Sequence, residues 1–295
     1  MEKFRRTFSF IFNHPLGKKH PVKSMLRFLY WQLQTTVHPH RYIIKTFISP
    51  VKFYARKGLT GITGNIYTGL HEFNDMGFVL HFLRPGDVFF DIGSNAGSYT
   101  LLASGVCKAL TTAIEPIPST YKILSDNITL NNLHDKVTLV NAGAGDSEGT
   151  LDFSSDQDTT NHVISSDETQ ANIIKVPVVI IDNIIENNVP VLMKIDVEGF
   201  EARVLNGMQS LLKNQQLKAL IIEMSNNDAY GFTGQFAHNL LTENGFVPLS
   251  YHPFTRGLTS PAGNKTDNVI YCRDMDFIAD RVNNAKSVKI MGEWI

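Results

Sequence analysis

The chain has 295 residues, of which 43% are hydrophobic and 19% are charged, a composition typical of one large folded domain and too apolar for an intrinsically disordered chain. Its two cysteines lie far apart in the sequence, which excludes a disulfide framework and a thiolate zinc site and favours a reducing compartment. No apolar run approaches the roughly 18 residues that a membrane-spanning helix needs, and we recognise no secretory signal. We therefore expect a cytoplasmic protein that does not cross a bilayer.

Charge is divided between two parts of the chain, which we call the basic arm (residues 1–60) and the body (residues 61–295). The basic arm has twelve Lys and Arg against one acid, a charge of +11, whereas the body has fifteen against twenty-seven acids, a charge of −12. Apolar residues recur at helical spacing from Val22 to Val37, which predicts an amphipathic helix. We expect its apolar face to cover the body. The alternative is peripheral docking on an anionic inner membrane surface or a phosphorylated substrate.

The body alternates short apolar runs with turns and helical stretches, the pattern of βαβ units around a parallel sheet. Five parallel strands are predicted, at 88–91, 111–114, 137–141, 191–195 and 220–223. Two more, at 246–251 and 268–272, should pair antiparallel, because the loop between them leaves no room for a crossover helix. An insertion at 149–182, which includes the polar stretch 154–160, is expected to pass over the ligand crevice. The body has no basic cluster of the kind that would bind nucleic acid.

A glycine turn follows the first strand. The strand ends in Asp91 and continues into Gly93, Asn95 and Gly97, which open a helix. This spacing differs from the dinucleotide fingerprint, and a carboxylate at the strand end would repel a pyrophosphate. A carboxylate suits instead the ammonium and sulfonium groups of S-adenosylmethionine. Glu115 ends the second strand 24 residues after Asp91, the separation at which an acid can accept bonds from ribose hydroxyls.

The fourth strand and its loop read Met193-Lys194-Ile195-Asp196-Val197-Glu198-Gly199-Phe200-Glu201, a run that resembles the signature of FkbM-type S-adenosylmethionine-dependent methyltransferases. Gly69 to Glu72, Asp87 to Gly97, Ile114 to Pro116 and Gly145-Asp146 are also similar to that family. The resemblance implies a Rossmann-like class I methyltransferase: an α/β fold with a seven-stranded sheet and helices on both faces. It also implies methyl transfer to a hydroxyl oxygen, commonly on a sugar or polyketide-like acceptor.

The resemblance implies roles for individual residues as well. Cofactor contacts are implied for Asp91, Gly93, Asn95, Gly97 and Glu115, and Asp146 lies where the chain of the family passes near the adenine. We further expect Glu72, just before the first strand, to reach the cofactor. The cofactor is therefore expected to be S-adenosyl-L-methionine.

Transfer to a hydroxyl needs a group that removes its proton. Asp196 is the first candidate, because it ends a strand next to the topological switch, and Glu198 follows on the same loop. Asp196 could instead cap the helix that begins near Gly199, with Glu201 completing the cap. His162, in the insertion, is the second catalytic candidate. No third ligand lies close in sequence to Asp196 and Glu198, so we assign no metal.

Two cations could assist acceptor binding. Lys194 points the same way as Asp196 in an apolar strand, so we expect it to pair with a carboxylate such as Glu198 or Glu223; direct contact with the acceptor is the alternative. Arg256, in an aromatic loop, suits a sugar or phosphate but could equally face solvent.

The sequence thus predicts an O-methyltransferase acting on a hydroxyl of a small molecule or a sugar or glycan precursor. A second enzyme hypothesis, an NAD-dependent nucleotide-sugar dehydrogenase, explains Glu115 but not the Gly93 to Gly97 spacing. A catalytically silent cofactor-binding protein, tethered to membrane by its basic arm, would leave Asp196 and His162 without a task. Nucleobase methylation is disfavoured because the loop after Asp196 lacks the proline and aromatic residue that would clamp a flipped base. The acceptor and the oligomeric state do not follow from the sequence.

Overall fold

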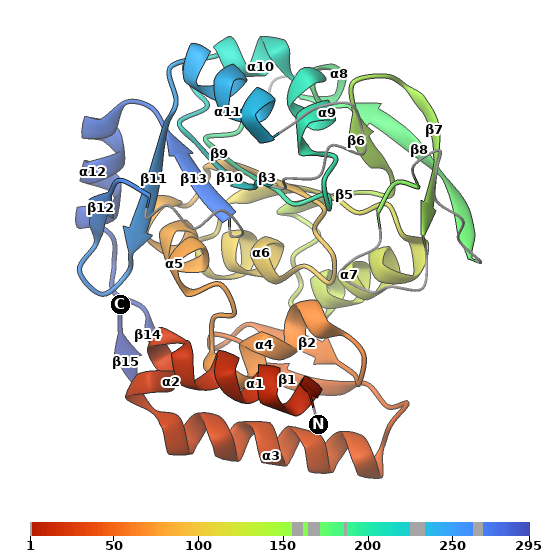
Figure 1. Ribbon diagram of the computed structural model, residues 1–295, viewed down its shortest axis with the longest axis vertical. Coiled ribbons are helices and arrows are strands. Elements are labelled where there is room, and N and C mark those ends of the chain that lie inside the picture. Colours follow the sequence, from red (N-terminus) through yellow and green to blue (C-terminus); the bar gives the residue numbers. More distant parts are fainter. Residues whose placement is uncertain (1, 155–161, 165–171, 186–187, 225–233, 262–267) are drawn as a thin grey trace.

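The computed structural model describes residues 2–154, 162–164, 172–185, 188–224, 234–261 and 268–295. An eight-stranded sheet, in the order β12-β11-β13-β10-β9-β3-β4-β5, lies at its centre (Figure 1). Its strands are β3 (Val88–Ile92), β4 (Leu110–Ile114), β5 (Val137–Val140), β9 (Leu192–Ile195), β10 (Ala219–Glu223), β11 (Val247–His252), β12 (Gly257–Thr259) and β13 (Asn268–Cys272). The strands from β5 to β10 pair in parallel, and β13, β11 and β12 extend the sheet by antiparallel pairing. The five parallel strands and the antiparallel pair are confirmed, and β12 adds a short eighth strand.

Helices cover both faces of this sheet, because its strands are apolar on both sides. Alternate side chains of β3 enter different cores: Phe89 packs into one buried cluster and Phe90 into the other. One cluster is covered by α5 (Phe73–Phe82), α6 (Ser98–Thr100), the π-helix η1 (Leu101–Val106), α7 (Pro118–Leu130) and α12 (Met275–Asn283), and the other by α8 (Ile181–Ile184), α9 (Glu201–Asn206), α10 (Gln209–Lys213) and α11 (Gly234–Glu243). The result is the three-layer α/β architecture of Rossmann-like class I methyltransferases.

The basic arm packs below the sheet as part of the same folded unit (Figure 1). Its elements are α1 (Glu2–Asn13), α2 (Pro15–Lys19), α3 (Pro21–Val37), β1 (Ile43–Thr46) and β2 (Lys52–Ala55), and α4 (Thr60–Thr68) follows at its end. Ile11, Leu16 and Phe28 are buried in the cluster that also contains residues of α5 and β3. No described helix is both long and apolar enough to cross a membrane.

The amphipathic helix of the arm is confirmed as α3, but the expected packing of its apolar face is wrong. Val22, Leu26 and Leu33 are each more than 60% exposed, and the buried side of α3 is formed by Ser24, Phe28, Trp31 and Thr35. The two aromatic side chains bury more area per residue than the aliphatic stripe can, and they fix which side of the helix faces the body.

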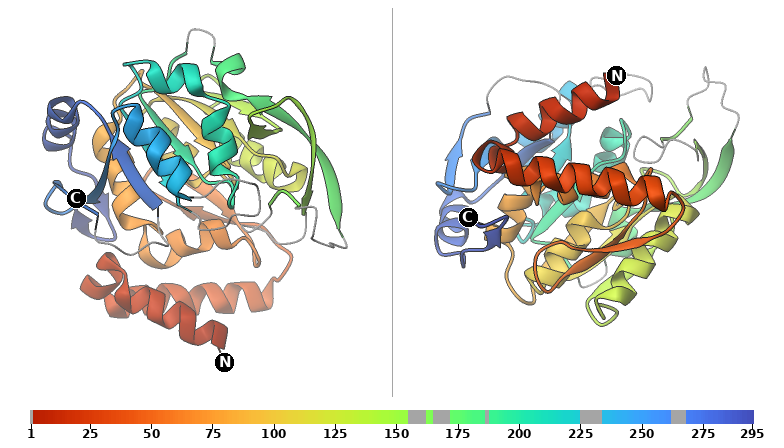
Figure 2. Two further views of the ribbon diagram at one scale, coloured as in Figure 1. Left: turned by 45° about the horizontal axis from the view of Figure 1, so that its top comes forward. Right: turned by 90° about the horizontal axis from the view of Figure 1, so that it is seen from below.

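Two smaller sheets complete the fold. Strands β6 (Gly143–Gly145), β7 (Gly149–Ser154) and β8 (Ile173–Ile180) form a three-stranded sheet beside the carboxyl end of β5 (Figure 2). They contain the described parts of the predicted insertion, whose stretches 155–161 and 165–171 lie outside the described residues. Strands β14 (Lys289–Ile290) and β15 (Glu293–Trp294) form a hairpin whose Glu293 accepts hydrogen bonds from Lys19 Nζ at 2.8 Å and His20 Nε2 at 2.9 Å. The two ends of the chain thus hold each other.

Candidate active site

The site lies at the carboxyl ends of β3 and β9, the neighbouring parallel strands at which the strand order reverses. Gly93 follows β3 with a φ of +79°, and a Cβ on it would lie 1.8 Å from the carbonyl oxygen of Asp196. Only glycine has both the backbone freedom and the space that this position needs. The glycine turn predicted from the sequence therefore lets the loops after β3 and β9 approach closely, which brings Asp196 beside the turn.

Glu115 and Asp91, the two acids predicted to contact the cofactor, both accept hydrogen bonds from the segment that follows β3. Glu115 is 5% exposed and accepts hydrogen bonds from the backbone N–H groups of Asn95 at 2.9 Å and Ile117 at 3.0 Å, one on each carboxylate oxygen. Asp91 is 2% exposed and accepts a hydrogen bond from Thr100 Oγ1 at 2.5 Å. Burial raises the pKa of Asp91 to about 6, although the Thr100 bond and Lys194 oppose the rise. Each carboxylate oxygen can accept a further bond from a ligand.

Lys194 is buried beneath the site with 1% exposure, and its Nζ donates to Asp196 Oδ2 at 2.8 Å and Asn268 Oδ1 at 3.3 Å. Burial lowers the pKa of Lys194, but the charges of Asp196 and Glu72 outweigh burial and raise it overall. The expected pairing of Lys194 with a carboxylate is thus confirmed, but its partner is Asp196 and not Glu198 or Glu223. Asp196 lies two residues further along the same strand face, so its carboxylate is close enough to bind the ammonium group of Lys194.

Three carboxylates meet at this point. Oxygen atoms of Asp196, Glu198 and Glu223 lie within 4.8 Å of one another. Burial, followed by the neighbouring Asp196, raises the pKa of Glu198 to about 7 and that of Glu223 to about 8. The sequence offered no third ligand near Asp196 and Glu198, whereas the fold supplies Glu223 from the end of β10. Beside the ion pair of Lys194 and Asp196, Glu198 and Glu223 therefore bind protons more tightly than ordinary carboxyl groups do.

The loop after β9 is stabilised by Glu201, whose Oε1 accepts from the backbone N–H groups of Val197 and Gly199, both at 3.1 Å. Glu198 and Gly199 have φ values of +52° and +98°, so the loop turns sharply here. The alternative in which Asp196 caps the following helix is not what the described contacts show, because its carboxylate binds Lys194. Glu201 therefore stabilises the loop and does not cap α9, whose N-cap residue Phe200 makes no side-chain hydrogen bond to the helix. Asp196 stays available to the crevice.

Three cavities adjoin Asp196. A cavity of about 300 Å³ is lined by Asp91, Asn95, Tyr99, Lys194 and Glu198, and a narrow one of about 50 Å³ by Gly93, Glu115, Ala142, Val163 and Phe200. The third, of about 610 Å³, reaches from Asp196 to the basic arm. We call the first two the cofactor-side cavities and the third the acceptor-side cavity. Asp196 is part of the lining of all three, so it stands where their contents would meet.

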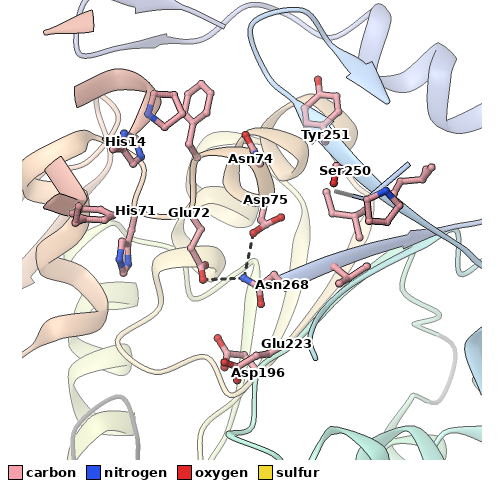
Figure 3. A pocket seen from close by; sticks show the side chains of 17 residues that line it. His14, His71, Glu72, Asn74, Asp75, Asp196, Glu223, Ser250, Tyr251 and Asn268 are labelled. Carbon is pink, nitrogen blue, oxygen red and sulfur yellow. Dashed lines mark hydrogen bonds between the residues drawn. The ribbon is translucent and has the colours of Figure 1, made fainter. Parts of the chain in front are cut away.

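The acceptor-side cavity is acidic at its floor and aromatic toward the arm (Figure 3). Asn268 donates to Glu72 Oε1 at 2.9 Å and to Asp75 Oδ2 at 3.2 Å, so these three side chains form one network beside Asp196 and Glu223. The opposite wall includes Phe10, His14, Phe73 and Tyr251. Glu72 also accepts a bond from Tyr99 OH at 2.6 Å, which ties the acceptor-side cavity to the cofactor side.

Three predicted site residues lie elsewhere or at the margin. Arg256 donates to Asn283 O at 2.7 Å and Ser287 Oγ at 3.3 Å, away from the lining of the described cavities. Asp146 pairs with Arg203 and Asn206, and the neighbouring Ala142 to Ala144 line the narrow cavity in its place. His162 is half-buried, and Val163, which follows it, lines the narrow cavity.

Other site residues were missed. Glu223 was considered only as a partner for Lys194, yet it ends a strand next to β9, the same signal that selected Asp196. Asp75 lies one helical turn after Glu72, which places both acids on one side of the chain and could have been noticed. Nothing local in the sequence connects Phe10, His14 or Asn268 with the site, because tertiary packing alone brings them there.

The donor set fits the expected cofactor. S-adenosylmethionine has two cationic groups and a ribose, and Asp91, Glu115, Asp196 and Glu198 place carboxylates around the cofactor-side cavities. In addition, Glu223 Oε2 is buried without a hydrogen-bond partner among the described residues. A bound ligand could supply the missing hydrogen bond.

The chain is similar to known methyltransferases. A family model described as the methyltransferase FkbM domain matches residues 91–248, more than half of the chain. The hexuronic acid methyltransferase AglP of Haloferax volcanii is 29% identical over 143 residues, which cover 47% of this chain and 56% of that protein. The matched region therefore spans little more than half of that relative.

Solved structures with similar folds are distant in sequence. Precorrin-6y C5,15-methyltransferase from Geobacter metallireducens is 14% identical, with a TM-score of 0.43 over 75% of this chain and 93% of that one. P. horikoshii TYW2 in complex with MeSAdo is 12% identical, with a TM-score of 0.42 over 86% of this chain and 83% of that one.

Proposed function

We propose that this chain, which belongs to the FkbM methyltransferase family and uses S-adenosylmethionine as its cofactor, transfers the methyl group to a hydroxyl oxygen of a sugar or glycan precursor. One observation carries the proposal: Asp196 borders both the cofactor-side cavities and the acceptor-side cavity. A reacting hydroxyl between them would lie within reach of a carboxylate that Lys194 holds in place.

The cofactor side is assigned to residues of the glycine turn and its neighbours. Asp91 and Glu115 would bind the ammonium and the ribose, and Gly93, Asn95 and Gly97 would let the backbone approach. Glu72 bridges the two sides through Tyr99. Asp146 pairs with Arg203 outside the lining of the cofactor-side cavities, so we do not assign it to the cofactor.

The carboxylate cluster would take the hydroxyl proton. When bound, the cofactor supplies an electrophilic methyl group on a positively charged sulfur. Glu198 and Glu223, whose pKa values are raised, would lose their protons more easily beside a positive charge, so the loaded site would hold a base in the reactive form. The carboxylates bind a proton more tightly once that charge is gone. The acceptor oxygen would gain the methyl group as its O–H proton passes to the cluster, and the electron pair of the broken S–CH3 bond would stay on the sulfur and neutralise its positive charge.

The lining of the acceptor-side cavity favours a neutral or cationic acceptor. Glu72, Asp75, Asp196 and Glu223 can accept hydrogen bonds from sugar hydroxyls, and Phe73 and Tyr251 offer apolar faces to a ring. An anionic acceptor would face these four acids, and the described lining of the cavity has no Lys or Arg to offset them. We therefore infer a difference from the hexuronic acid named for the Haloferax relative: the acceptor here has no carboxylate near its reacting hydroxyl.

The first test is calorimetric titration with S-adenosylhomocysteine, with NADH in parallel. We expect binding of the former and a large loss of affinity in Glu115→Gln, because the new amide would direct an N–H at a backbone N–H. Asp135→Asn, at an exposed acid outside the site, serves as the matched control. Tight binding of NADH without binding of S-adenosylhomocysteine would instead support the dehydrogenase alternative.

The second test follows transfer of labelled methyl to a panel of acceptors. We expect neutral sugars and amino sugars to be methylated and the corresponding uronates to react more slowly. Alkaline hydrolysis of the product separates ethers from esters, because only esters are cleaved. Preferred methylation of uronates, or an ester product, would refute the proposed acceptor class while leaving the methyltransferase assignment intact.

A further inference from the structure

The outer face of α3 is an apolar surface with nothing packed on it in the described structure. Val22, Leu26, Leu29, Leu33 and Val37 follow one side of the helix and are between 52% and 71% exposed. Their spacing of three and four residues aligns them in one stripe. The helix α3 has 17 residues, is about 25 Å long and runs along the lower edge of the molecule in Figure 1.

The apolar surface extends beyond α3. Among the described residues, nine of the fourteen most exposed large hydrophobic side chains lie between residues 12 and 44. Besides the stripe, they are Phe12, Tyr30, Tyr42 and Ile44. Scattered exposed hydrophobics need no explanation, but such a concentration in one short part of a chain marks an interaction surface.

Cations border this apolar surface. A shallow groove beside Val22, Leu26 and Tyr30 is also lined by Lys19, Lys23 and Arg27. Lys19 and Lys23 donate to the C-terminal hairpin, at Glu293 and Met291 O. Arg27 Nη1 is buried and has no hydrogen-bond partner among the described residues, and burial lowers the pKa of Arg27. An anionic group in the groove would be attracted by the charge of this guanidinium.

Charge complementarity identifies the occupant. The arm has a net charge of +11 with Glu2 as its single acid, so a second copy presenting the same face would be repelled. An apolar helical stripe with cations along its border is typical of a helix that lies in the interface of a bilayer containing anionic lipids. Aromatic side chains such as Tyr30 and Tyr42 suit the headgroup level of that interface.

We propose that the outer face of α3, with Lys19, Lys23 and Arg27 at its border, docks on the surface of a lipid bilayer that carries anionic headgroups. The apolar stripe enters the boundary between headgroups and acyl chains, and the cations contact lipid phosphates. Because Phe10, His14 and Pro15 of the same arm line the acceptor-side cavity, docking holds that cavity close to the membrane surface. The docking does not depend on the proposed methyl acceptor.

The test is cosedimentation of the full chain with vesicles of phosphatidylcholine alone and of phosphatidylcholine with phosphatidylglycerol. We expect binding to the anionic vesicles, weakened by added salt. The variant Leu26→Gln/Leu29→Gln/Leu33→Gln keeps helix propensity and should reduce partitioning at least about tenfold. Ile173→Gln/Val247→Gln removes comparably exposed apolar side chains from the body and should bind as the unaltered chain does. Arg27→Met should lower the preference for anionic over neutral vesicles.

Circular dichroism and the affinity for S-adenosylhomocysteine establish that each variant is folded. If the triple variant does not fold, the single variant Leu29→Gln replaces it. Unchanged vesicle binding by a folded α3 variant would overturn the proposal. So would equal binding to neutral and anionic vesicles without salt dependence. Absence of vesicle binding overturns it as well, and sedimentation equilibrium then shows whether the stripe instead joins two copies, which the α3 variant would separate.

Discussion

The basic arm carries its positive charges on its outer surface, whereas the body carries negative charges around an internal cavity. In the arm, Lys18, Lys19 and Lys23 lie on the exposed side, next to an apolar stripe that also faces outward. In the body, acids such as Asp196 and Glu223 point into the acceptor-side cavity, close to a buried lysine. The near-zero net charge of the chain therefore conceals two oppositely charged regions, for which we propose different partners: an anionic surface outside and a hydroxylated acceptor inside.

The two regions nevertheless share one core. Ile11 and Phe28 of the arm are buried in the same cluster as Phe78 of the body, and the arm supplies part of the wall of the acceptor-side cavity. Substitutions can therefore ask which properties belong to one region and which to both.

The largest effect is expected where the body performs its chemistry. Asp196→Asn keeps the shape of the side chain but removes the carboxylate that borders all three cavities. We expect methyl transfer to fall by about 10²–10⁴-fold, the range for loss of a general base. The affinity for S-adenosylhomocysteine should change far less. Single-turnover kinetics measures the rate of methyl transfer, and calorimetry measures the affinity. Asp135→Asn is the control, and an Asp196→Asn enzyme with nearly full transfer would remove Asp196 from the mechanism.

The next effect concerns the crossing of the loops after β3 and β9. Gly93→Ala would place a Cβ 1.8 Å from Asp196 O, whereas Gly86→Ala has a similar φ of +86° and nothing within 4 Å. We expect the first variant to lose about 3 kcal/mol or more of unfolding free energy. The second should lose about 1–2 kcal/mol from its backbone conformation alone. Equal losses in urea denaturation would mean that the close approach is unimportant.

A third prediction probes the arm through His14, which is 6% exposed. Its Nε2 lies 2.6 Å from Leu70 O and its Nδ1 accepts from Leu16 N at 3.2 Å, so the neutral ring uses both nitrogens and caps α2. Burial lowers its pKa from 6.5 to about 4. Between these values the unfolded chain binds a proton that the folded chain does not, so stability is complete above pH 6.5 and is lost as the pH falls.

We expect protonation of His14 to lower the free energy of unfolding by about 3 kcal/mol as the pH falls through this range. Urea denaturation followed by the fluorescence of buried Trp31 measures it. His14→Gln should be less stable at neutral pH but should lose less on acidification, and His252→Gln, at an exposed ring, should behave as the unaltered chain does. An unchanged pH slope in His14→Gln would show that this ring does not control the arm.

Local patterns were sufficient to predict the sheet and much of the cofactor side. Runs such as Leu192–Ile195 are apolar on both faces, and the acids at strand ends must meet at one edge of a parallel sheet. The side of α3 that faces the body could not be read from its stripe, because Phe28 and Trp31 compete with the stripe for burial. The partner of Lys194 and the surroundings of Arg256 depend on tertiary packing, which no spacing encodes.

The smallest expected effect is the counterpart of His14 in the body, with the opposite sign. The pKa values of Glu198 and Glu223 rise from 4.5 to about 7 and about 8, chiefly through burial. Between pH 4.5 and those values the folded chain holds protons that the unfolded chain has released, so these acids lower the free energy of unfolding as the pH rises. Both side chains are partly exposed, and solvent screening keeps the change small. In Glu198→Gln/Glu223→Gln, urea denaturation should show a shallower decline of stability toward alkaline pH, with an unchanged acid limb because His14 remains. A decline identical to that of the unaltered chain would mean that the cluster releases its protons at ordinary carboxyl values, and it could not then hold a proton near neutrality.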